Sequence, residues 1–147
     1  MHRKVAAVIV AVLALGLASC GGSEPVLTRA QLASKISVAC RQALAQAQRE
    51  MRANARDRSG ATFVNAILDD QQAVMARIKH LNPPAAAKAD FDAFKQGVQQ
   101  RIDIVERVKG AGRAGIQRAI ASIQRQGEVV TRRVQAAARR LRVQGCI

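Results

Sequence analysis

The sequence predicts an all-α protein that folds as an up-down-up-down four-helix bundle. Three observations lead to this class. Apolar residues recur every three or four positions in four separate segments, which is the spacing of one face of a helix. Proline and glycine clusters separate these segments, and no stretch shows the period-two alternation that indicates a strand. Because 49% of the 147 residues are hydrophobic, the chain has enough apolar surface to form a core despite its net charge of +14.

The first helix is expected to begin at Thr28. Thr28 and Gln31 have the spacing of a capping box, and Leu27 and Leu32 flank them as a hydrophobic staple. The helix then continues until Ser59-Gly60 interrupts it. Its inner face is expected to consist of Leu32, Ile36, Cys40, Ala43, Ala47 and Met51.

The second and third helices are separated by a double proline. The second helix should stop at Asn82, because a residue before proline is pushed out of the helical region and Pro83 and Pro84 cannot continue a helix. Its inner face is expected to consist of Phe63, Ile67, Val74, Met75, Ile78 and Leu81. The third helix should run from about Pro84 to Lys109, with an inner stripe of Ala87, Phe91, Phe94, Val98, Ile102, Val105 and Val108.

The fourth helix has the most regular apolar pattern, after a turn marked by Gly110, Gly112 and Gly115. Spacings of four and three alternate along its inner face, as in the seam of a helical bundle. This face is expected to consist of Ile116, Ile120, Ile123, Gly127, Val130, Val134, Ala137 and Leu141. A glycine at a core position indicates either close approach of a neighbouring helix, which we favour, or a cavity for a lipid-like ligand.

The first residues indicate export from the cytoplasm. Basic residues 2–4 precede an apolar run, residues 5–18, which is too short for the roughly 20 residues that cross a bilayer but has the length of a signal-peptide core. Leu17-Ala18-Ser19-Cys20 then resembles the bacterial lipobox, in which the cysteine is diacylated and becomes the first residue. The alternative is an ordinary signal peptide cleaved nearby, with Cys20 left as a free thiol.

Three regions follow from the lipobox. Residues 1–19 are expected to be a cleaved lipoprotein signal peptide. Residues 20–27 would form the lipidated N-terminus and a short flexible tether, since Gly, Ser and Pro dominate them. Residues 28–147 would form the helical bundle domain. Two or more acyl chains hold a protein stably on a membrane, so the domain should lie at the outer face of the cytoplasmic membrane.

The remaining cysteines, Cys40 and Cys146, are expected to form one disulfide, because exported chains meet an oxidising compartment. In an up-down-up-down bundle the end of the fourth helix returns beside the first, which allows the Cα–Cα distance of less than about 7 Å that a disulfide needs. The alternative is two free buried cysteines. A staple suits a core built largely from Ala, Val and Ile.

The first helix contains Ile36-Ser37-Val38-Ala39-Cys40, the break reads Leu81-Asn82-Pro83-Pro84, and the chain closes on Leu141-Arg142-Val143-Gln144-Gly145-Cys146. In these features residues 28–147 resemble a group of small secreted or lipidated helical proteins of actinobacteria. The resemblance implies a helical bundle at the cell envelope and no particular chemistry, since the group has no assigned activity. The chain is more basic than that group leads one to expect.

Catalytic and metal-binding patterns are not found in this sequence. His80, the one histidine outside the signal peptide, is expected to interact with the C-terminal end of the second helix. Asp69 and Asp70 are adjacent, so they diverge on a helix and are expected on a solvated face rather than as a carboxylate pair. We therefore expect a protein that is not an enzyme and has no metal, haem or other cofactor.

Arginine marks the outer face of the fourth helix. Four arginines repeat every seven residues opposite the apolar seam, and others widen them into a band. The expected anion-binding residues are Arg118, Arg125, Arg132, Arg133, Arg139 and Arg140, with Arg142 beside them. From Arg107 onward ten basic residues face one acid, Glu128, so pairing within the helix cannot neutralise the band. A merely solvated face is the alternative.

These observations together predict a lipid-anchored binding module of the cell envelope. Its partner would be an anionic lipid, a cell-wall polymer or an acidic protein, because the tether holds the arginine band beside such groups. Nucleic acid is disfavoured, since no stacking aromatic residues interleave the band. The alternative function is a carrier that holds an apolar small molecule between the helices near Gly127.

Overall fold

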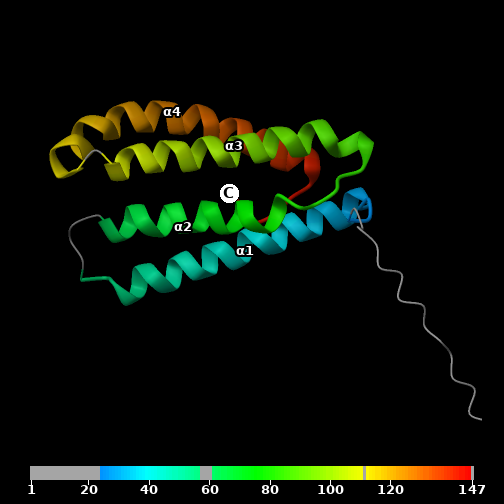
Figure 1. The fold of residues 1–147 in the computed structure, drawn as a ribbon, viewed down its shortest axis with the longest axis horizontal. Coiled ribbons are helices and arrows are strands. Elements are labelled where there is room, and N and C mark those ends of the chain that lie inside the picture. The colour runs from blue at the N-terminus through cyan, green and yellow to red at the C-terminus, as the bar shows by residue number, and fades with distance from the viewer. Residues whose placement is uncertain (1–23, 57–60, 111, 147) are drawn as a thin grey trace, which may run out of the picture.

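The computed structural model describes residues 24–56, 61–110 and 112–146, with the side chains of 110–124 left out of the description. The predicted signal peptide and the lipidation residue Cys20 lie outside these residues. The described chain forms four α-helices and no strand (Figure 1). Their bounds are α1 Arg29–Ala53, α2 Ala61–Ile78, α3 Ala85–Gly110 and α4 Gly112–Leu141. The all-α class with four helices is thereby confirmed for this part of the chain.

The start of α1 is built as the local sequence predicts. The Gln31 backbone N–H donates to Thr28 Oγ1 at 3.2 Å, and the Thr28 N–H donates to Gln31 Oε1 at 2.8 Å, which completes the capping box. These bonds satisfy two N–H groups that a helix start leaves without intrahelical partners. Leu32 directly after them is fully buried, so the cap also directs the chain into the core.

The loop between α2 and α3 is joined to the segment before α1. The Leu27 N–H donates to the Asn82 carbonyl oxygen at 2.9 Å, and Asn82 Nδ2 donates to the Glu24 carbonyl oxygen, also at 2.9 Å. At the same end of the molecule, an Arg29 side-chain nitrogen donates to the Arg140 carbonyl oxygen at 2.8 Å. The start of α1, the end of α2 and the end of α4 therefore lie together.

Among the residues whose side chains are described, the core cluster and the apolar residues packed on it lie between Leu27 and Cys146. Its largest fully buried side chains are Phe91, Phe94, Leu32, Ile36, Ile78, Leu141, Val98 and Val134. The predicted inner faces of α1 and α3, and of the described part of α4, are buried or half-buried as expected. A chain that begins at residue 24 therefore keeps every described member of the core.

The prediction that Phe63 is a core residue is wrong, because its side chain is 57% exposed. Phe63 lies in the first turn of α2, beyond the reach of the core cluster, whose first α2 member is Leu68. Ala66 and Leu68, which the periodicity did not select, are buried instead. The apolar face of α2 is therefore shifted along the helix relative to the predicted one.

Each helix packs on the next one in the chain, whereas the first and last helices make little direct contact. α1 packs on α2, α2 on α3 and α3 on α4, whereas α1 and α4 touch at very few positions. The segment after α4 crosses the space between them: Figure 1 shows this red C-terminal segment leaving α4 toward the α1–α2 pair. Val143 in this segment is buried. The gap between the two outer helices is therefore bridged by the end of the chain.

Candidate functional sites

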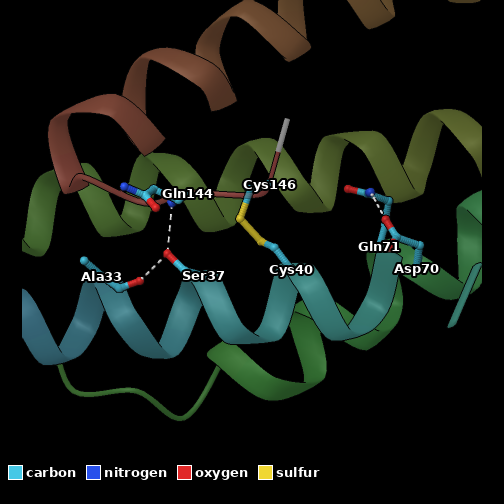
Figure 2. The surroundings of a disulfide bond; sticks show 7 residues. All are labelled: Ala33, Ser37, Cys40, Asp70, Gln71, Gln144 and Cys146. Atoms are coloured by element: carbon cyan, nitrogen blue, oxygen red, sulfur yellow. Dashed lines mark hydrogen bonds between the residues drawn. A yellow bond between two sulfur atoms is a disulfide. The ribbon is translucent and has the colours of Figure 1, made fainter. Parts of the chain in front are cut away.

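The bridge across the α1–α4 gap is covalent. Cys40 of α1 and Cys146 form a disulfide with a Cα–Cα distance of 5.0 Å, which confirms the predicted pairing (Figure 2). One turn earlier on α1, the Ser37 hydroxyl accepts from the Gln144 N–H at 2.9 Å and donates to the Ala33 carbonyl oxygen at 2.7 Å. Ser37 is a buried polar residue, and these two bonds satisfy it.

Two residues in left-handed backbone conformations turn the chain from α4 to Cys40. Arg142 has φ 60°, and the N–H of the next residue, Val143, donates to the Ala138 carbonyl oxygen at 2.8 Å, which closes the helix end. Gly145 has φ 76°, and a Cβ atom there would lie 2.9 Å from Arg41 Cγ. Glycine at this position therefore lets the chain pass close to α1 and reach Cys40.

Beside the disulfide lies a cavity of about 350 Å³ to which all four helices contribute. Its apolar lining consists of Leu44, Val74, Phe94, Val98 and Val134. Its polar lining consists of Asp70, Gln71, Arg101, Thr131 and Gln135, and Cys40, Gly145 and Cys146 form the remaining wall. A concave apolar surface with a few convergent polar groups is the usual composition of a small-molecule site.

Asp70 is the most unusual residue in this lining. Its Oδ2 accepts from Gln71 Nε2 at 2.7 Å (Figure 2), whereas its Oδ1 is buried and has no hydrogen-bond partner. Burial raises the pKa of the Asp70 carboxyl above its ordinary value, and the Gln71 hydrogen bond and the Arg101 charge oppose that rise. The expectation that Asp70 lies on a solvated face is therefore wrong, whereas Asp69 is exposed as expected.

Arg101 of α3 faces the same cavity. Burial lowers the pKa of its guanidinium, and the charge of Asp70 opposes this. The ion pairs of 4 Å or less found among the described residues do not include one between Asp70 and Arg101. The cavity thus contains one acidic and one basic side chain that act on each other electrostatically without direct contact.

The predicted anion-binding arginines of α4 are exposed where the structure describes their side chains. Arg125, Arg132 and Arg139 are exposed on the side of the helix opposite the buried Val130 and Val134. Arg133 and Arg142 are exposed as well. Among the described side chains, none of these five arginines forms an ion pair with a carboxylate. The side chain of Arg118 lies outside the described residues.

Arg140 differs from these five arginines because its side chain pairs with a carboxylate of the bundle. Its Nε donates to Asp90 Oδ1 on α3 at 2.5 Å, and Arg29 of α1 lies 3.9 Å from the other oxygen of Asp90. Its role in anion binding stays a prediction, but this bond already engages one of its guanidinium nitrogens.

A basic hollow of about 440 Å³ lies between α3 and α4. Arg107 of α3 faces Arg125 and Arg133 of α4 across it, and Ile104, Val129 and Val130 supply its apolar part. Asp103 adds one carboxylate to this lining, so the three arginines leave it with a net positive charge. The sequence showed Arg107 as one of many basic residues but did not show that it joins the α4 arginines, because this depends on how α3 is rotated against α4. We refer to Arg107, Arg125, Arg132, Arg133 and Arg139 as the arginine face.

The close helix approach predicted at Gly127 occurs at Gly97 instead. A Cβ atom built on Gly127 would meet nothing within 4 Å, so the preferred interpretation of close packing there is wrong. A Cβ atom built on Gly97 of α3 would collide with Val134 Cγ2 of α4. Gly127 lines neither the cavity nor the basic hollow.

Comparison with protein-family models, curated proteins and solved structures found no match to this chain. Within the part of the chain that the structure describes, none of the helices combines the length and hydropathy that a bilayer crossing requires. The same residues contain no group of three or more His, Cys, Asp or Glu side chains that could hold a metal ion.

Proposed function

We propose that this protein is a lipid-anchored binding module of the bacterial cell envelope, which acts without catalysis and binds an anionic surface through its arginine face. The acylation of Cys20 after removal of residues 1–19, the up-down-up-down order of the helices and a place at the outer face of the cytoplasmic membrane belong to this proposal. The lipobox-like Leu17-Ala18-Ser19-Cys20 supports the anchor.

The observation that carries the proposal is the exposure of arginines that form no ion pair of 4 Å or less with a described carboxylate. Arg125, Arg132 and Arg139 share one side of α4, and Arg133 and Arg107 extend it to the hollow beside α3. Each basic residue near an anionic membrane contributes about 1 kcal/mol of attraction. Several acting together would bind a tethered domain to a phosphate-rich surface, and salt would weaken that binding.

The partner that fits best is an anionic lipid headgroup. The hollow bounded by Arg107, Arg125 and Arg133 combines guanidinium groups with the partly exposed Val129, whose side chain is 42% exposed. Guanidinium groups bind phosphate through paired hydrogen bonds, and an apolar group at the same place suits the boundary between headgroup and acyl chain. A cell-wall polymer offers the phosphates without that apolar boundary.

Cosedimentation with vesicles tests the proposal. Residues 24–147 should sediment with vesicles that contain phosphatidylglycerol at low ionic strength, should dissociate at high ionic strength, and should not bind vesicles of phosphatidylcholine alone. A variant with Arg118, Arg125, Arg132 and Arg139 changed to Gln should lose binding. A phosphate-containing wall polymer added as competitor distinguishes the two sources of anionic groups, the lipid headgroup and the cell-wall polymer.

A matched variant controls for net charge. Arg49, Arg52, Arg77 and Lys79 are exposed on α1 and at the end of α2, so changing all four to Gln removes the same charge from another part of the domain. This control should bind as wild type does. If both variants bind equally, the arginine face has no special role and the proposal is wrong.

A further inference from the structure

The cavity beside the disulfide contains a polar end that the fold itself leaves incomplete. Asp70 Oδ1 is buried and has no hydrogen-bond partner, although its sister oxygen accepts from Gln71. A buried acceptor in this state destabilises a fold, so such atoms are rare in native proteins and each needs a physical reason. Oδ1 is closed even to water, so a ligand in the cavity does not reach that atom; what the cavity offers a ligand is the charge of the Asp70 carboxylate, which no ion pair of 4 Å or less neutralises among the described residues.

Arg101 gives the cavity a second recognition group of opposite charge. It lines the same space from α3, and its charge acts on Asp70 without forming an ion pair of 4 Å or less. If Asp70 served only to neutralise Arg101, direct contact would be the stable arrangement of two partly buried charges. Because no ion pair of 4 Å or less joins them, each charge is left for an oppositely charged group of a ligand in the cavity that both residues line.

The rest of the lining limits the size and character of that molecule. Val74, Phe94 and Val98 form an apolar wall next to the two charges. The volume of about 350 Å³ is at the lower end of the range for small-molecule sites, which suits a compact ligand rather than an acyl chain or a peptide. Because Asp70 and Arg101 carry opposite charges, the ligand should have no net charge.

We propose that this cavity binds a compact zwitterion with an apolar body, namely an α-amino acid with an apolar side chain. Its ammonium group bonds to the Asp70 carboxylate, its carboxylate bonds to the Arg101 guanidinium, and its side chain packs on Val74, Phe94 and Val98. The reverse orientation would place the ligand's carboxylate beside the Asp70 carboxylate and its ammonium group beside the Arg101 guanidinium, so repulsion between like charges excludes it. This site is separate from the arginine face, so the two proposals stand or fall independently.

Binding of defined ligands to the full-length chain, purified in detergent and measured by isothermal titration calorimetry, tests the proposal. Leucine and phenylalanine should bind. N-acetyl-leucine lacks the ammonium charge, leucinamide lacks the carboxylate and glycine lacks the apolar body, so each should bind at least tenfold more weakly than leucine. Absence of binding by leucine and phenylalanine, or equal binding by N-acetyl-leucine, would overturn the proposal.

Two substitutions assign the contacts. Asp70→Asn should weaken leucine binding at least tenfold, whereas Asp69→Asn, the exposed neighbour on the same helix, should leave it unchanged. Arg101→Gln should weaken the binding of leucine but not that of leucinamide, because leucinamide has no carboxylate to lose. Wild-type affinity in Asp70→Asn would contradict the assignment. If a substitution prevents folding, the ligand series on the wild-type chain decides alone.

Discussion

Removal of the Cys40–Cys146 disulfide should lower the free energy of unfolding by about 5 kcal/mol. The bond closes a loop with a sequence separation of 106 residues. In the chain-entropy model such a loop restricts the unfolded chain by about 16 cal/mol/K, which is about 4.8 kcal/mol at 25 °C. Because α1 and α4 touch at very few positions, only the buried Val143 and the Gln144–Ser37 hydrogen bond would still hold the C-terminal segment when the disulfide is broken.

The double variant Cys40→Ala, Cys146→Ala of residues 24–147 allows the measurement. A domain of about 120 residues has an unfolding entropy of about 0.25 kcal/mol/K, so the melting temperature should fall by about 15–20 °C. The urea m-value should rise, since the unfolded chain without its cross-link exposes more surface. Circular dichroism against temperature and urea gives both quantities.

The wild-type domain in a phosphine reductant is the control, because it breaks the bond without removing the cysteine side chains. It should melt close to the double variant, with the small difference reporting the buried thiol of Cys40. A fall of less than about 5 °C in both samples would refute the reasoning. It would show that the core alone holds the C-terminal segment in place.

Three further predictions concern single residues. Asp70→Asn should be more stable than wild type at pH 7 but not near pH 4, as measured by urea unfolding. Burial raises the pKa of Asp70 above its ordinary value of 3.8, so the wild-type fold loses stability as pH rises and the buried carboxyl ionises. Equal stability of the two proteins at pH 7 would contradict this. Gly97→Ala should destabilise the fold by about 1–3 kcal/mol, because the new methyl group would collide with Val134. Gly127→Ala should stabilise the fold by about 0.5–1 kcal/mol, because the new methyl group would meet open space. Thermal melts compare the two variants, and equal effects would contradict the packing described. Thr28→Ala should cost about 1 kcal/mol by removing the cap of α1, and an unchanged melting temperature would show that the capping box contributes nothing.

Local sequence patterns predicted the helices well because their causes are local. The capping box of Thr28 and Gln31 involves neighbours three residues apart, and the Pro83-Pro84 break follows from the backbone of those residues alone. The seam of α4 is a property of periodicity, and its described members Val130, Val134, Ala137 and Leu141 are all buried. The disulfide was predictable because the predicted lipidation of Cys20 left two cysteines for a single bond.

The features that sequence reasoning missed depend on how one helix sits against another. A glycine on an inner face can be predicted from spacing, but whether a neighbour approaches it depends on how the helices are placed: Val134 closely approaches Gly97, whereas a Cβ atom at Gly127 would meet nothing within 4 Å. The burial of Asp70 and the contribution of Arg107 to the basic hollow depend on helix rotation in the same way. The bond from Arg140 to Asp90 joins residues 50 positions apart and has no sequence signal.

The disulfide and the cavity have a common structural origin in the open α1–α4 interface. Side chains of an Ala-rich helix pair can close an interface only when the helices approach closely, as α3 and α4 do at Gly97. Where α1 and α4 stay apart, the C-terminal segment with the buried Val143 fills only part of the space, and the bundle loses the stability that direct packing of the two helices would add. The cross-link compensates through the unfolded state, independently of packing, so it stabilises the fold while the space beside it remains. A carboxylate with a buried, unbonded oxygen can persist in such a wall because the same bond that forms the wall offsets its destabilising effect.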